Sequence, residues 1–175
     1  MRASLIGKAA AFGSVMCGFE SRAFKLFFAA PIANTFSALK VASIAQKTEL
    51  YLPTNPQTRL FLSSMVRSGS LTSITFIPAS QLPEDIKAKH PTWKYSLCAR
   101  IVFPYREGRS TFAKWRLRYR GAHTPSITLS RLKQLKKSNP GFFLIISTSR
   151  GFLLNDEALL LGIGGILICE RQGTN

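Results

Sequence analysis

The chain has 175 residues, of which 46% are hydrophobic and 11% aromatic, so it can build an apolar core and is not globally disordered. Its length predicts one or two small domains. Lysine and arginine outnumber aspartate and glutamate by 24 to 8, which gives a formal charge of +16. Such a charge favours a polyanionic partner, either a nucleic acid or an anionic membrane surface, without deciding between them.

Several classes of site are disfavoured by the residue types present. The three cysteines lie far apart and form no Cys-x-x-Cys pair, so we expect neither a zinc site nor a disulfide framework. The longest apolar run, residues 158–169, is shorter than the roughly 20 residues of a transmembrane helix. Neither histidine has a nucleophile motif, and no phosphate-binding glycine loop occurs. We therefore expect no catalysis, metal, cofactor, small-molecule substrate or transmembrane segment.

Residues 1–28 form a basic extension in which four cations accompany a single acid, Glu20. An apolar stripe at helical spacing consists of Leu5, Ala9, Phe12, Met16 and Phe19. A basic, acid-poor, amphipathic N-terminus is typical of an organellar transit peptide. An ordinary N-terminal helix or a ribosomal extension is the alternative.

The next part, residues 29–120, is predicted to be an α/β subdomain with the order α-β-α-β-β and a mixed sheet. The first helix begins at Pro31, whose missing N–H is tolerated in a first turn. Thr54 is predicted to cap the second helix, and Gly69 to end it in the left-handed conformation. The strands are expected over 49–52, 71–77 and 95–103, with a loop over 78–93.

A basic hairpin is predicted to complete this subdomain. Residues 106–109 turn the chain, and residues 113–119 alternate between apolar and basic side chains. The cations of this row are Lys114, Arg116, Arg118 and Arg120. On one strand face they would stand about 6.5–7 Å apart, close to the spacing of phosphates along a nucleic acid. A solvated outer face is the plainer interpretation, but four cations without an acid between them favour an anionic partner.

The last part, residues 121–175, is predicted to be mainly β with a short helix. Strands are expected over 127–129, 142–146 and 166–169. Ser130 is predicted to cap a short basic helix, and Asn155 to cap a second one whose first turn carries two acids. Both parts together make an α/β protein of two small subdomains.

The sharpest pattern lies in this last part. A hydrophobic strand delivers Ser147, Thr148, Ser149, Arg150 and Gly151 to its end, and Gly164 and Gly165 follow the second helix. Hydroxyl groups can bond bases, ribose and phosphate, Arg150 supplies a cation, and glycine permits close approach of the backbone to RNA. A loop whose serines satisfy their own backbone fits the composition equally well.

These residues resemble the family of the eighth universal protein of the small ribosomal subunit. The family pattern is Ser-Thr-Ser-Lys-Gly, a helix, Gly-x-Gly-Gly-Glu and a strand with cysteine. It is matched without a gap by Ser147–Gly151, Gly162, Gly164, Gly165 and Cys169. Residues 31–34 also resemble the opening Asp-Pro-Ile-Ala-Asp of the family. Pro53 and Gly69 match the family's spacing across its second helix, and residues 124–126 resemble its Arg-Pro-Gly turn.

The resemblance implies a two-part α/β fold that binds a helix in the central domain of small-subunit rRNA. It implies RNA contacts from Ser147, Thr148, Ser149, Gly151, Gly164 and Gly165. The chain departs from the family at several positions. Ile166 replaces a glutamate after the two glycines. Pro56 and Thr58 replace two lysines at a helix start, where Arg59 is the nearby cation, and Ala38 replaces an arginine of the first helix, which leaves Lys40 there. These departures and the basic N-terminus favour a mitochondrial ribosome, with a plastid as second choice.

The sequence thus predicts a structural constituent of a small ribosomal subunit that binds rRNA, contacts neighbouring ribosomal proteins and supports assembly. Two other functions stay open. Residues 1–28 would suit a membrane-surface or partner-binding basic module, and the cations would equally suit a free regulatory RNA-binding protein.

Overall fold

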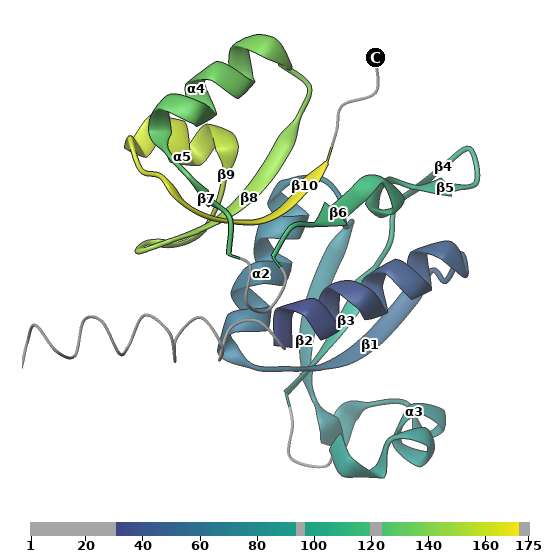
Figure 1. Ribbon diagram of the computed structural model, residues 1–175. Coiled ribbons are helices and arrows are strands. Elements are labelled where there is room, and N and C mark those ends of the chain that lie inside the picture. Colours follow the sequence, from purple (N-terminus) through teal and green to yellow (C-terminus); the bar gives the residue numbers. More distant parts are fainter. Residues whose placement is uncertain (1–30, 94–96, 120–123, 172–175) are drawn as a thin grey trace, which may run out of the picture.

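The computed structural model describes residues 31–93, 97–119 and 124–171. The predicted extension, residues 1–28, and the cation Arg120 lie outside the described residues. Within the described ranges the chain has the mixed α/β composition that the sequence predicts (Figure 1).

The N-terminal part contains a helix over residues 31–44, then strand β1 (Glu49–Thr54), helix α2 (Pro56–Arg67), strand β2 (Ser73–Pro78) and strand β3 (Leu97–Val102). The sheet order is β1-β3-β2, and both pairs are antiparallel. The prediction of a mixed sheet is therefore wrong in this detail. β3 lies between β1 and β2 and runs opposite to both, so the two strands of the β1-α2-β2 unit never pair with each other.

The ends of α2 are set by local polar groups. Asn55, and not Thr54, caps the helix: its Oδ1 accepts a hydrogen bond from Thr58 N at 2.7 Å, while Thr58 Oγ1 accepts one from Asn55 N. The Thr54 hydroxyl instead donates across the sheet to Leu97 O at 2.7 Å. Gly69 adopts φ 68° after the helix, as predicted.

Residues 79–93, predicted as a loop, form three short helical turns: η1 (Ala79–Gln81), α3 (Glu84–Lys89) and η2 (Pro91–Trp93). The acids Glu84 and Asp85 occupy the first turn of α3, and its lysines lie near the end, where their charges suit the helix dipole. Ala79 and Leu82 are buried with Cys98 of β3. These turns therefore cover part of the sheet face that the helices leave open.

The predicted turn over residues 106–109 is confirmed, whereas the prediction of a long second hairpin strand over residues 113–119 is wrong. Strands β4 (Tyr105–Arg106) and β5 (Arg109–Ser110) pair around Glu107 and Gly108, both at positive φ. The chain then enters the turn η3 (Thr111–Lys114), which buries Phe112. Strand β6 (Trp115–Leu117) pairs with the last strand of the molecule and not with β3. The turn at η3 breaks the alternation that predicted one long strand.

The second sheet has the order β6-β10-β8-β9, and β7 also pairs with β10. Its members and helices are β7 (Ser126–Ile127), α4 (Leu129–Ser138), β8 (Phe143–Thr148), β9 (Gly151–Leu154), α5 (Asn155–Leu161) and β10 (Gly165–Arg171). Both helices pack at one side of this sheet (Figure 1). β9 was not predicted from the sequence, because four apolar residues between a turn and a helix show no alternation.

The caps of α4 and α5 also differ from the predicted ones. Thr128 accepts the hydrogen bond from Arg131 N, so it caps α4 in place of Ser130. Asn155 is the first residue of α5, and its Oδ1 accepts a hydrogen bond from Leu144 N in β8. Glu157 Oε2 accepts from Leu154 N instead. Asn155 is buried and ties α5 to the sheet.

Both sheets share one hydrophobic core. It includes Ile32 from the first helix, Phe61 from α2, Ile101 from β3, Trp115 from β6 and Ile168 from β10. Trp115 is fully buried, and its Nε1 donates a hydrogen bond to Ser70 Oγ. The arrangement of the two sheets is therefore fixed by packing.

Candidate nucleic-acid interface

The segment from Ser147 to Gly151 forms the end of the β8–β9 hairpin. Thr148 pairs with Gly151, which has φ 98°, and Ser149 and Arg150 form the exposed turn between them. Thr148 Oγ1 donates to Gly151 O at 3.0 Å and accepts from Arg150 N at 3.1 Å. The Thr148 hydroxyl is thus engaged by its own turn, which leaves Ser149 and Arg150 to meet an external partner.

Ser147 lies inside the sheet and not at its tip. It is opposite Phe152 of β9 on one side and Ile166 of β10 on the other. Ile166 is half-buried against the main core. The hairpin end is consequently held from three strands, which fixes the position of the turn before any partner binds.

Gly164, just before β10, and Gly165, its first residue, have a structural reason to be glycine. A Cβ on Gly165 would lie 2.3 Å from Ser147 O, and one on Gly164 would lie 2.6 Å from Ile127 O. Close packing of β10 against β8 and β7 therefore accounts for both residues. Contact of Gly164 and Gly165 with RNA stays a prediction.

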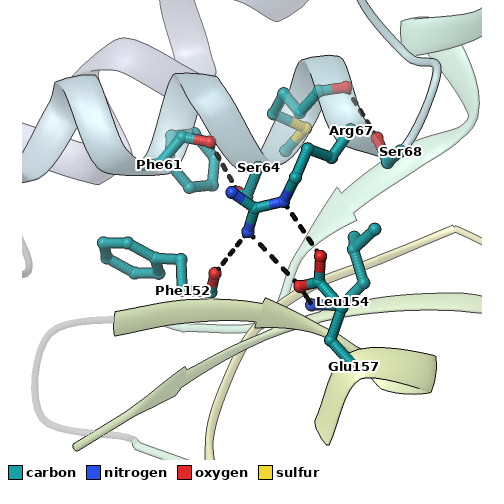
Figure 2. A network of polar contacts seen from close by, with 8 residues as sticks. Phe61, Ser64, Arg67, Ser68, Phe152, Leu154 and Glu157 are labelled. Carbon is teal, nitrogen blue, oxygen red and sulfur yellow. Dashed lines mark hydrogen bonds and ion pairs between the residues drawn. The ribbon is translucent and has the colours of Figure 1, made fainter. Parts of the chain in front are cut away.

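An ion-pair network holds this hairpin against the N-terminal part (Figure 2). Arg67 of α2 binds Glu157 of α5, with Nε 3.0 Å from Oε1, and donates from Nη2 to Phe152 O at 2.8 Å. A groove of about 540 Å³ runs beside it, and its exposed lining includes Leu60, Leu160 and Arg150. The network couples the turn carrying Ser149 to α2.

The predicted row of four cations is broken in the structure. Lys114 lies in η3 and Arg116 in β6, and both are exposed. Arg118 instead pairs with Glu170 of β10 at 2.5 Å, and this hydrogen bond raises the pKa of Arg118. Arg120 lies outside the described residues. Only Lys114 and Arg116 therefore keep, within the described part of the chain, the unneutralised charge that the prediction assumed.

Lys40 is directed inward toward the backbone of the η3–β6 segment. Its Nζ donates to Ala113 O and, at 3.2 Å, to Trp115 O. Burial lowers the pKa of Lys40, and the nearby charge of Arg116 lowers it further. These contacts give Lys40 a structural role that joins the first helix to β6.

Three further cations, which were not singled out from the sequence, are exposed on or next to the β4–β5 hairpin. Tyr105 Oη donates to Lys47 O at 2.7 Å, which places Lys47 beside the β4–β5 hairpin that carries Arg106 and Arg109. We call Lys47, Arg106, Arg109, Lys114 and Arg116 the hairpin basic patch. Four of its five members, all except Lys47, lie within residues 94–137, where the sequence has twelve lysines and arginines and one acid, Glu107.

Other site types find no support in the described ranges. They contain no group of three histidines, cysteines or acids able to hold a metal ion. No helix there combines the length and apolar character needed to cross a bilayer.

Residues 30–170 match the family described as Ribosomal protein S8. The chain belongs to the ribosomal protein S8 family. It is therefore a ribosomal protein of the small subunit and an rRNA-binding protein, in a family that is structural and not enzymatic. A search of curated protein sequences finds no match.

The structure shows the surroundings of the residues that depart from the family pattern, among them Thr58 and Ile166. Thr58 is buried in the cap of α2 and cannot replace a lysine, whereas Arg59 beside it is half-buried. Ile166 completes the core where the family has glutamate. Thr58 and Ile166 thus leave uncharged two positions that the resemblance expects to be charged.

Replacing Gly165 with alanine should destabilise the protein by about 2 kcal/mol or more, because the added methyl group overlaps the Ser147 carbonyl. Gly162→Ala is the control, since its Cβ would meet open space and only the positive φ of 66° is strained, at about 1 kcal/mol. Urea unfolding measures both. Equal losses would show that the close packing of β10 on β8 is not what requires glycine.

Proposed function

We propose that this protein is a structural constituent of a mitochondrial small ribosomal subunit, where it binds a helix in the central domain of the small-subunit rRNA and supports assembly. The observation that carries the proposal is the β8–β9 hairpin, whose turn exposes Ser149 and Arg150 on a rigid support. Neighbouring ribosomal proteins are the other partners that membership of the family implies.

The chemistry of the turn supports an RNA helix as the ligand. A hydroxyl group can bond the ribose 2′-OH or a base edge in the shallow minor groove of A-form RNA, and an arginine can bond phosphate. The turn is short and its backbone is held by β8 and β9, so it offers these groups without a large ordering cost.

The distribution of charge supports a second contact to the RNA backbone. Four members of the hairpin basic patch lie in residues 106–116, a segment with one acid, Glu107. By contrast, five ion pairs elsewhere neutralise cations of α2, α3, β3, α4 and the residue after β6. Concentrated positive charge favours phosphate and gives no base specificity.

A mitochondrial location is supported by composition alone. Residues 1–28 combine cations, a helical apolar stripe and one acid, as transit peptides do. The departures at Ala38, Pro56, Thr58 and Ile166 fit a ribosome whose RNA has diverged. A plastid is the second candidate.

Cosedimentation and localisation test the proposal together. A tagged full-length protein should travel with small subunits through a sucrose gradient and be recovered from purified mitochondria. Recovery at the top of the gradient would contradict the ribosomal assignment. Small subunits that carry the protein in plastids or in the cytosol would contradict only the mitochondrial one. Binding to anionic vesicles that survives nuclease treatment would favour the membrane-surface alternative.

Replacing Ser149 with alanine should weaken binding to the rRNA helix by about 1 kcal/mol, the typical net contribution of one hydrogen bond. Thr148→Val should act differently, because the Thr148 hydroxyl bonds Gly151 O and Arg150 N within the turn. It should lower stability as well as affinity. Titration of the rRNA helix and thermal unfolding separate the two effects. An unchanged affinity for Ser149→Ala removes that hydroxyl from the interface.

Replacing Arg116 with glutamine should reduce the slope of log affinity against log salt by about 1, since one phosphate contact is lost. Arg118→Gln is the matched comparison from the same segment. Arg118 is neutralised by Glu170, so its loss should change the slope less. Binding measured from low to moderate salt gives both slopes. A larger change for Arg118 than for Arg116 would contradict the assigned roles.

A further inference from the structure

The first sheet has two edge strands, β1 and β2, because β3 lies between them. Among the described residues β2 pairs only with β3. Four of its six residues are exposed, and Phe76 is 38% exposed despite its size. The outer side of β2 is therefore an open sheet edge.

The hydrogen bonds of β3 show which backbone groups point outward from that edge. Phe103 N–H donates to Thr48 O on the β1 side, whereas Val102 O accepts from Thr72 N on the β2 side. Bonding directions alternate along an antiparallel strand. Thr75, opposite Arg100, therefore bonds toward β3. Ile74 and Phe76 direct their N–H and C=O groups to the open edge.

The two edges of the sheet differ in their protection. The same alternation turns Glu49 and Pro53 of β1 outward; glutamate brings a charge and proline has no N–H to donate. β2 reads Ser-Ile-Thr-Phe-Ile-Pro, with no charge and no proline before its last residue. An edge with free donors and acceptors and no such protection is a template for pairing with another strand.

We propose that the open edge of β2 binds an extended strand of a neighbouring protein in the small subunit, which joins the sheet by backbone hydrogen bonds. The alternating donors and acceptors of Ile74 and Phe76 match a peptide backbone. Because β2 carries no cation, it has no positive charge to attract phosphate, and its open N–H groups alternate with C=O groups that would repel it. Ile74 packs on the core face of the sheet and Phe76 lies on the same face, so apolar residues are expected at alternate positions of the added strand. This inference rests on the proposed function.

Hydrogen–deuterium exchange tests the backbone pairing in the full chain. In the free protein, the amides of Ile74 and Phe76 should exchange fast and that of Thr75 slowly. In purified small subunits, the first two should slow by at least about tenfold. Fast exchange of Ile74 and Phe76 within the subunit would overturn the proposal.

A photo-crosslinking residue at position 75, whose side chain is exposed, identifies what covers the edge in the same subunits. A crosslink to a continuous segment of one ribosomal protein supports the proposal. Crosslinks to rRNA, to a second copy of this chain or to nothing would overturn it. If the protein does not enter small subunits at all, the proposed function fails; if it enters but shows one of those outcomes, only this inference fails.

Two substitutions separate backbone pairing from recognition of the aromatic ring. Phe76→Pro removes an outward N–H, and Phe76→Val keeps it with a good strand former. The crosslink should persist in Phe76→Val and be lost in Phe76→Pro, with rRNA binding unchanged in both. Phe76→Lys provides a second disruption if the proline variant unfolds, because a charged edge residue resists strand addition. Retention of the crosslink in Phe76→Lys would contradict the proposal.

Discussion

Burial of Trp115 between the two sheets is the contact on which the arrangement of the molecule depends. Its indole donates to Ser70 at the end of α2, its carbonyl accepts from Lys40, and the guanidinium of Arg171 lies 5.7 Å from its ring centroid. One residue, through its ring and its carbonyl, is thus joined to the first helix, the α2–β2 connection and the last strand. The hairpin basic patch and the β8–β9 turn therefore keep a fixed relation to each other.

Much of this fold follows from local rules. Gly69 has the positive φ that its residue type predicted, and residues 106–109 form the predicted turn, in which Glu107 as well as Gly108 has positive φ. The partner of β6 was not predictable, because alternation tells which face of a strand is buried and says nothing about which strand lies beside it. The same limit explains the wrongly predicted mixed sheet, which depends on the insertion of β3 between β1 and β2.

The candidate interface was predictable as a segment and not as individual atoms. The sequence placed Ser149 and Arg150 at the end of a buried strand, where the structure has them exposed. It could not show that Arg118 meets Glu170, that Lys40 meets the carbonyl of Trp115, or that Thr148 bonds within its own turn. Each of these depends on which residues the fold brings together, and two of the three join residues distant in the chain.

The position of β10 in the second sheet has a consequence for the order in which the chain folds. β10 lies between β6 and β8 and also pairs with β7, yet it follows all three in the sequence. A chain that is imported behind an N-terminal transit peptide enters the organelle N-terminus first. Until the residues up to Arg171 have entered, β6 and β7 have no strand to pair with. The β8–β9 hairpin can close earlier, but it lacks the support of Ile166. The N-terminal sheet is free of this delay, so folding is expected to be vectorial, with competence to bind RNA acquired last.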